Sequence, residues 1–348
     1  INADGTLTYA DGKLQNVAIV DGKIVAGTEA MPAQLWEKII PAAQEGTYLA
    51  VTSDIHHKFK EDFAVDSETG EVIGTIMSTE RLAALLAQAS KDFGGIYFDQ
   101  FVSCGDQGDA NTKFRGADYW LRVNDAMKAV GENELVLGGG FFINGNHEWA
   151  NGTYASLKGT NAATKQIHEA GYVEEADDYI LYSLSAAQTN NSFNTEDIEA
   201  LDKFLASETG DKPIFIISHY PLHNYNRTVQ RKDDVINMLN KYGDKLQIVF
   251  FWGHNHTEED PSYAKVFTED IEGTPINFTY ASAGCMTDDE YDVHAVATTN
   301  KATIVYIAPD KTVTLTYYDV NYKQMSSTTL AKHGTEQTEI RQNIFHNF

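Results

Sequence analysis

The chain reads Phe-Trp-Gly-His-Asn-His from Phe251 to His256. This stretch follows the apolar run 246–250, whose length and composition predict a buried strand. The two imidazoles are two residues apart at the point where that strand ends, so both can point at one spot from a loop. One His-x-His pair alone is weak evidence for a metal site, because pairs of surface histidines are common.

Four earlier signals of the same kind each follow a segment that reads as a strand. They are Asp-Ile-His at 54–56, Gly-Asp-Gln-Gly-Asp at 105–109, Gly-Asn-His-Glu at 145–148 and Ser-His-Tyr-Pro at 218–221. In α/β sheets, functional groups gather at the carboxyl ends of the strands. The five signals in this order therefore predict one composite site rather than five unrelated turns or buried histidines.

The side chains at these positions form a mixed set of donors, with two carboxylates, one amide and four imidazoles. Such a set suits borderline transition metals such as Mn, Fe or Zn better than Ca or Mg. These donors are too many for one ion and fit two ions if one carboxylate bridges them. The candidate metal ligands are Asp54, His56, Asp106, Asn146, His219, His254 and His256.

Strand-like and helix-like segments alternate from about residue 47 onward, which predicts a layered α/β fold. Short strands dominate after His256, and we expect them to form a second sheet packed on the first. Residues 1–45 contain three Asp-Gly pairs between short alternating segments, which predicts a small β extension, followed by a short helix over 34–43. We therefore expect a main domain over 46–325, preceded by this extension and followed by a polar tail over 326–348.

The composition favours a large core and a small substrate. Of 348 residues, 42% are hydrophobic, and 50 acidic residues against 26 basic ones give a formal net charge of -24. Such a charge repels nucleic acid and anionic membranes. No apolar run has the length needed to cross a bilayer, so we expect no transmembrane segment.

The same composition is typical of a bacterial secreted or cell-surface protein, with a cytoplasmic location as the alternative. The chain begins at Ile1 rather than Met, so we expect that an upstream segment has been removed or is not included in this sequence. The two cysteines, Cys104 and Cys285, lack the C-x-x-C spacing of a metal site. We expect them to be buried thiols, with a single disulfide as the alternative.

The ordered set of motifs resembles the calcineurin-like metallophosphoesterases over about residues 47–320. The matching motifs are D-x-H at 54–56, G-D-x-x-D at 105–109, G-N-H-E at 145–148, the lone His219, and G-H-x-H at 253–256. The resemblance implies a four-layer α/β/β/α sandwich of two mixed sheets. It also implies a hydrolase of phosphoesters that uses two divalent metal ions.

The resemblance further implies which ion each ligand would hold. One ion would be held by Asp54, His56 and His256. The other would be held by Asn146, His219 and His254. Asp106 would bridge the two ions, and a hydroxide between them would attack the phosphorus in line with the leaving group.

Residues near the ligands are candidates for catalysis and substrate binding. The resemblance implies that His147 faces the phosphate or the leaving oxygen without binding metal, and that Asp109 orients His147 and favours its cationic form. His223 is close enough in sequence to the motifs to reach the substrate, and Arg227 and Arg115 are candidates for a phosphate clamp.

Departures from two related groups narrow the class. Purple acid phosphatases usually have Gly in place of His56 and Tyr in place of Asp109. Protein Ser/Thr phosphatases usually have Arg in place of Asn144 and Arg-Gly in place of the pair at 110–111, which here is Ala-Asn. We therefore expect a phosphodiesterase or phosphomonoesterase that acts on a small or lipid-derived phosphoester. A nuclease and a catalytically inactive surface or binding protein are the alternatives.

Overall fold

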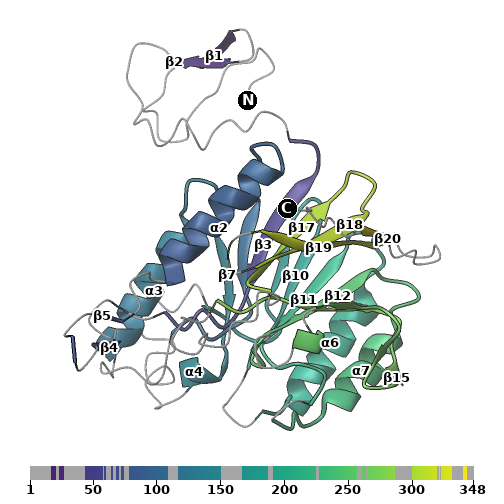
Figure 1. The fold of residues 1–348 in the computed structure, drawn as a ribbon. Coiled ribbons are helices and arrows are strands. Elements are labelled where there is room, and N and C mark those ends of the chain that lie inside the picture. Colours follow the sequence, from purple (N-terminus) through teal and green to yellow (C-terminus); the bar gives the residue numbers. More distant parts are fainter. Residues whose placement is uncertain are drawn as a thin grey trace. The chain divides into compact units, whose positions relative to one another are not determined.

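In this computed structural model the chain divides into two units, Ile1–Gln44 and Glu45–Phe348. The larger unit contains two β-sheets that face each other between two pairs of helices (Figure 1). The structure describes residues 17–20, 23–26, 44–57, 59, 64–65, 68–69, 72–73, 78–108, 117–149, 167–186, 191–224, 227–256, 261–263, 265–286, 300–319, 321, 323–330 and 340–342.

In the smaller unit, β1 (Val17–Val20) pairs antiparallel with β2 (Lys23–Ala26). The two strands flank the Asp-Gly pair at 21–22, where the sequence predicts a turn. The helix that we expect over 34–43 lies outside the described residues.

The first sheet of the larger unit has eight strands in the order β20-β19-β18-β17-β3-β6-β7-β8. Its parallel half consists of β3 (Thr47–Thr52), β6 (Gln100–Ser103), β7 (Gly140–Ile143) and β8 (Ile167–His168). Its antiparallel half consists of β17 (Ala302–Ile307), β18 (Val313–Tyr318), β19 (Gln324–Leu330) and β20 (Ile340–Gln342).

The second sheet has six strands in the order β13-β16-β12-β11-β10-β9. Four of them are parallel, β10 (Ile180–Leu184), β11 (Ile214–Ser218), β12 (Ile248–Trp252) and β16 (Thr279–Ser282). The edge strands β9 (Val173–Glu175) and β13 (Val266–Phe267) run antiparallel to their neighbours.

The expectation that the strands after His256 form a sheet of their own is wrong. β13 and β16 extend the second sheet beside β12, whereas β17 pairs with β3 and carries β18 to β20 into the first sheet. The reason is that each parallel core has an open edge whose backbone groups need partners, and the later strands supply them. The expected strand at 293–296 lies outside the described residues.

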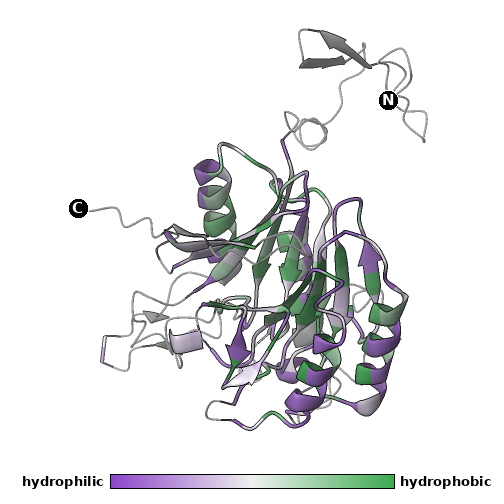
Figure 2. Cartoon of the chain, turned by 90° about the vertical axis from the view of Figure 1, so that its right-hand side faces the viewer, coloured by the Kyte–Doolittle hydropathy of each residue, from purple (hydrophilic) through white to green (hydrophobic). Residues whose placement is uncertain are grey.

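Helices cover the outer face of each sheet and complete four layers, which confirms the expected sandwich. α2 (Ser78–Asp92) and α3 (Ala117–Gly131) pack on the first sheet, and α6 (Thr195–Ser207) and α7 (Lys232–Asn240) pack on the second. Figure 2 shows hydrophobic residues on the inner strands and hydrophilic residues along the outer helix surfaces.

The core strands bury both faces, which explains their continuous apolar sequence. In β12, Val249 and Phe251 lie in the core between the sheets, whereas Phe250 and Trp252 lie in the core under α6 and α7. Burying both faces fixes the register of the strand, because a slip by one residue would exchange the two sets. The loop that follows β12 is therefore held at a defined height and orientation.

The remaining described elements are short. They are α4 (Asn146–Trp149), the 3₁₀ turn at Pro261–Tyr263, and two small ribbons, β4 (Ala64–Val65) with β5 (Val72–Ile73) and β14 (Asp270–Ile271) with β15 (Thr274–Pro275). None of the helices among the described residues has both the length and the apolar character that a membrane span requires. Cys104 and Cys285 are buried free thiols, so the disulfide alternative is wrong.

The C-terminal boundary differs from the expectation of a surface tail that begins at residue 326. β19 crosses that position and pairs with β18 through Leu330, and β20 pairs with β19 in turn. Most of β19 is half-buried. A half-buried strand near a sheet edge needs few apolar residues, and this explains why the segment reads as a polar tail.

Candidate metal centre

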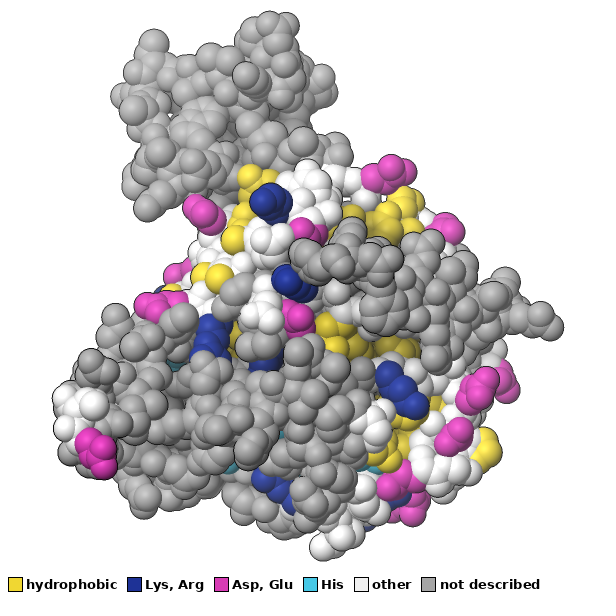
Figure 3. Space-filling view, in the orientation of Figure 1, with side chains coloured by type: hydrophobic (Ala, Val, Ile, Leu, Met, Phe, Trp, Pro, Cys, Tyr) yellow, Lys and Arg dark blue, Asp and Glu magenta, His cyan; other side chains and the backbone are white. Residues whose placement is uncertain are grey.

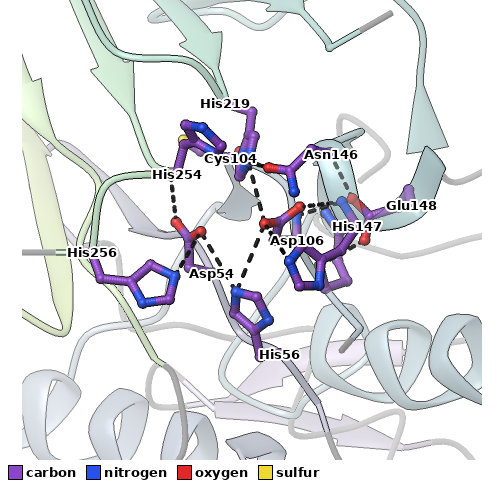
Figure 4. A network of polar contacts seen from close by, with 12 residues as sticks. Asp54, His56, Cys104, Asp106, Asn146, His147, Glu148, His219, His254 and His256 are labelled. Atoms are coloured by element: carbon purple, nitrogen blue, oxygen red, sulfur yellow. Dashed lines mark hydrogen bonds and ion pairs between the residues drawn. The ribbon is translucent and has the colours of Figure 1, made fainter. Parts of the chain in front are cut away.

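All five sequence signals lie at the carboxyl ends of parallel strands. In the first sheet they follow β3, β6 and β7, and in the second sheet they follow β11 and β12. Because the two sheets face each other, these strand ends bring the candidate ligands into one cluster (Figure 4). The first sheet contributes Asp54, His56, Asp106 and Asn146, and the second contributes His219, His254 and His256.

Backbone hydrogen bonds continue beyond the strands and hold the ligand loops together. Asp54 N–H donates to Gly105 O over 3.0 Å, and His56 N–H donates to Asp106 O over 2.9 Å. Across the second sheet, Gly253 N–H donates to His219 O over 3.1 Å. The positions of the ligand side chains are therefore set by the same ladders that define the sheets.

Several candidate ligands adopt the left-handed backbone conformation, which is strained for residues other than glycine. The φ angles are 47° at Asp54, 43° at His56, 53° at Asp106 and 68° at His254. Such conformations cost roughly 1–3 kcal/mol each and persist where the surroundings over-determine them. Here the loop hydrogen bonds impose them, and each turns a side chain toward the cluster.

Asp54 divides its two oxygens between the backbone and the cluster. Oδ2 accepts the N–H of His254 over 2.8 Å. Oδ1 lies 3.4 Å from His256 Nε2 and 3.7 Å from His56 Nε2. Burial alone would raise the pKa of Asp54, but the imidazoles of His256 and His56 that face its carboxylate outweigh burial and lower the pKa well below its usual value.

Asp106 divides its oxygens in the same way. Oδ1 accepts the N–H of His147 over 2.8 Å. Oδ2 lies among three imidazoles, 3.3 Å from His219 Nε2, 3.7 Å from His56 Nε2 and 3.9 Å from His147 Nε2. Burial opposes ionisation, yet the positive charges of His219 and His147 lower the pKa of Asp106 strongly. This central oxygen is where a ligand shared by two ions would lie.

The surroundings of His219 call for a cation at its Nε2. Its Nδ1 lies 2.9 Å from Cys104 O, a carbonyl that can only accept, so Nδ1 carries a proton. Nε2 then faces two further acceptors, Asn146 Oδ1 at 2.9 Å and Asp106 Oδ2 at 3.3 Å. Without metal a second proton takes this place, because the Asp106 charge outweighs burial and raises the pKa of His219 to about 9.

Three buried atoms of the cluster have no hydrogen-bond partner among the described residues, namely Asp54 Oδ1, His56 Nε2 and His254 Nε2. Buried polar atoms are normally paired, so these three call for a partner such as a metal ion. The ligand atoms of Asp54, His56 and His256 lie within 4.8 Å of one another, as do those of Asp106, His219 and His254. These donor groups fit a dinuclear metal site.

The chain was also compared with known proteins. The family model described as calcineurin-like phosphoesterase matches residues 47–258. The chain belongs to the calcineurin-like phosphoesterase family. No curated protein matches it. The matched range contains all five motifs, and with the two donor groups it supports a metal-dependent phosphoesterase.

His147 lies close to the candidate metal ligands of this phosphoesterase. A residue that only contacts substrate would not need to be so close to them. Together with His56 and Asp106 it forms a third group whose ligand atoms lie within 4.8 Å of one another. Its ring meets that of His56 edge-on at 4.4 Å, and its side chain is 20% exposed. The geometry alone therefore permits a ligand role for His147 as well as a role toward the substrate.

Glu148 is a structural member of the site that the sequence reasoning missed. Its fully buried carboxylate accepts the N–H groups of Gly145 at 2.6 Å, Asp106 at 3.0 Å and Gln107 at 2.8 Å. Burial and the Asp106 charge raise the pKa of Glu148 to about 8, against the effect of the backbone donors. Its place beside His147 in the motif is the signal that would have identified it.

The structure distinguishes among the other predicted residues. His223 is fully buried, and its expected contact with substrate stays a prediction. Arg227 is exposed, and its Nη1 donates to His254 O over 2.9 Å, which places the guanidinium beside a candidate ligand. Asp109 and Arg115 lie outside the described residues.

Replacing Gly253 with Ala should weaken metal binding. A Cβ at this position would overlap the Ser53 side chain and would lie 2.5 Å from Asp54 Oδ2, the oxygen that holds His254. We expect Gly253→Ala to lower the affinity for Mn²⁺ by about 10-fold or more in titration calorimetry. Gly210→Ala is the matched control, because its Cβ would meet only Lys212 N at 3.9 Å. Equal affinities in the two variants would contradict this account.

Metal uptake at pH 7 should release protons. The pKa of His219 is raised to about 9, and Cys285 and Asp54 raise that of His256 against the effect of burial, so both rings are protonated in the metal-free protein. Because raised pKa values mean that protons compete below them, metal affinity should increase as pH rises toward about 9.

Metal-free stability should change in the opposite direction. The ion pair between His219 and Asp106 stabilises the metal-free fold fully below pH 6.5, and this contribution is lost as pH rises through about 9.

Calorimetry in two buffers of different ionisation enthalpy measures the protons that are released on metal uptake. The same binding enthalpy in both buffers at pH 7 would show that neither ring holds a displaceable proton.

Proposed function

We propose that this calcineurin-like phosphoesterase hydrolyses small or lipid-derived phosphoesters, either diesters or monoesters, with two divalent transition metal ions such as Mn, Fe or Zn. The observation that carries the proposal is the position of Asp106 Oδ2, which belongs to one donor group, lies 3.7 Å from His56 of the other, and has three imidazoles within 3.3–3.9 Å. In the proposed site, Asp54, His56 and His256 hold one ion, Asn146, His219 and His254 hold the other, and Asp106 is shared.

When bound, such ions lower the pKa of a water molecule and neutralise charge on the phosphoryl oxygens. The two carboxylates of the site balance only half of the charge of two divalent ions and leave about +2. A phosphate is therefore attracted to this point although the chain as a whole carries a net charge of -24. The protein's own part is to hold the ligand atoms in place before substrate arrives, which the loop ladders accomplish.

We propose that His147 donates a proton to the leaving oxygen. Its backbone N–H is fixed by Asp106 Oδ1, and its partly exposed ring can meet a bound phosphoester from the rim of the site. Asp109 is proposed to orient His147. Arg227 and Arg115 are proposed to contact the phosphate, and the placement of Arg227 beside His254 supports its assignment.

The charge distribution supports a small substrate rather than a nucleic acid. Basic side chains of the described residues stand apart from one another on the face shown in Figure 3, and acidic side chains also lie on that face. A polynucleotide needs a continuous basic surface for its phosphates. A compact phosphoester needs only the local positive charge of the metal site.

The acidic composition with only two cysteines also supports the proposal of a secreted or cell-surface bacterial protein.

Within the chain, we propose that the catalytic domain begins near residue 46 and includes β19, because that strand belongs to the first sheet.

Metal analysis combined with two model substrates tests the proposed function. The wild-type protein should bind two ions and hydrolyse p-nitrophenyl phosphate or bis-p-nitrophenyl phosphate. Asp106→Asn should lose metal and lower turnover by more than about 100-fold, because the shared oxygen is replaced. Asp197→Asn is the control. Its half-buried carboxyl group lies on α6, outside the metal site, and accepts a hydrogen bond from the side chain of Asn194.

Three results would overturn the proposal. Absence of both metal and turnover would exclude the enzyme. Two bound ions without turnover of either ester would favour the inactive binding protein. Cleavage of a DNA oligonucleotide far faster than of both esters would favour the nuclease.

His147→Ala separates the catalytic role of this residue from a ligand role. If His147 supplies a proton, the variant should keep both ions while kcat falls by about 10²–10⁴-fold. Metal content and kcat are measured on the same preparation. His168→Ala is a suitable control, since this histidine stacks on Tyr172 in another part of the fold. Loss of an ion from His147→Ala would assign His147 to the metal ligands instead.

A further inference from the structure

Three buried polar side chains lie in a row beside the turn that carries His254 and His256. The hydroxyl of Tyr280 lies 2.7 Å from His223 Nδ1, and His223 Nε2 lies 3.4 Å from the side-chain amide nitrogen of Asn255. All three side chains are buried, and Tyr280 Oη also accepts the N–H of Leu222 over 2.9 Å. The row therefore runs from β16, through the segment after β11, to the middle of the ligand turn.

Aromatic neighbours fix the orientation of the His223 ring. It stacks on Tyr263 with centroids 3.6 Å apart and planes 8° from parallel, and it meets Trp252 edge-on at 4.7 Å. Burial, together with the charge of Lys232, lowers the pKa of His223 to about 3. A neutral ring has one donor and one acceptor nitrogen, so it can link a hydroxyl on one side to an amide on the other.

Backbone and side-chain hydrogen bonds hold the ligand turn, and His223 reaches its middle, between the two imidazoles. At His254, Asp54 Oδ2 accepts the N–H and Arg227 donates to the carbonyl, so this residue is fixed through its backbone. The N–H of Asn255 donates to Gly253 O within the turn itself. The side-chain contact of Asn255 with His223 ties the middle of the turn to the rest of the second sheet.

We propose that His223 is a positioning residue, which through Asn255 holds the turn 253–256 so that His254 and His256 face different metal ions. The inference rests on the proposed function, because it assigns His223 a role toward ions bound at that site. It differs from a substrate contact, since the ring has no exposed surface. It also differs from core packing, since a phenyl ring could fill the same space between Tyr263 and Trp252 (the aromatic box).

His223→Phe separates the hydrogen bonds from the packing. The variant keeps an aromatic ring against Tyr263 but loses both polar contacts, so Asn255 is no longer held. We expect Mn²⁺ affinity at one or both sites to fall by about 10- to 100-fold in titration calorimetry of the full chain. His223→Gln keeps a polar end toward Asn255 and should recover part of this loss.

Tyr280→Phe removes only the hydroxyl at the other end of the row and should lower Mn²⁺ affinity in the same direction. The effects of His223→Phe and Tyr280→Phe should not add in the double variant, because both act through one chain of contacts. Tyr182→Phe is the matched control. Tyr182 is a buried tyrosine of the second sheet that lies among the side chains under α6. Removing its hydroxyl group should leave the Mn²⁺ affinity unchanged.

Wild-type Mn²⁺ affinity in a folded His223→Phe variant would overturn the positioning role while leaving the proposed function intact. If His223→Phe does not fold, Asn255→Ala decides, because it removes the other partner of the contact without opening the aromatic box. Unchanged affinity in Asn255→Ala would overturn the proposal, and a 10- to 100-fold loss would support it. A wild-type protein that binds no ions would fail the proposed function first, and the positioning role with it.

Discussion

The buried negative charge of Asp106 organises the centre of the molecule. A carboxylate removed from water is costly unless donors and positive charges surround it. Here one oxygen takes a backbone N–H of the β7 loop, and the other faces imidazoles that come from both sheets. Glu148 adds a buried carboxyl group that accepts backbone N–H groups of the same loops. The loops are shaped around these two acidic side chains, and the charge of Asp106 in turn creates a place that requires cations.

The packed layers of the sandwich hold the strained and charged residues of the site in place. Apolar packing on both faces of strands such as β12 holds the strand ends rigidly, so strained residues such as Asp54 and His254 keep their left-handed backbones. The strain and the buried charges both reduce stability, and the three hydrophobic clusters of the fold offset them. The cost of preorganising the site is thus borne by layers that have no part in the chemistry.

The sequence predicts which side chains come together at the strand ends, because metal chemistry demands particular residue types there, and these stand out as motifs. It predicts the layers, because strands and helices differ in their apolar spacing. It does not predict which sheet β16 and β17 join, since the local pattern of a strand does not name the edge that it pairs with. Nor does it reveal Glu148 or the burial of His223, because a charged or polar residue is buried only when distant partners satisfy it. The polar sequence of β19 conceals a strand for a similar reason.

The division of donors between the sheets has a consequence for how the molecule stays together. In the proposed site each ion takes ligands from both sheets, so neither sheet alone offers a complete set. An ion that binds only the assembled sandwich favours assembly by mass action, as a ligand that bridges two subunits favours a dimer. The metal supply of the surroundings would then govern not only turnover but also how tightly the two halves of the protein are joined.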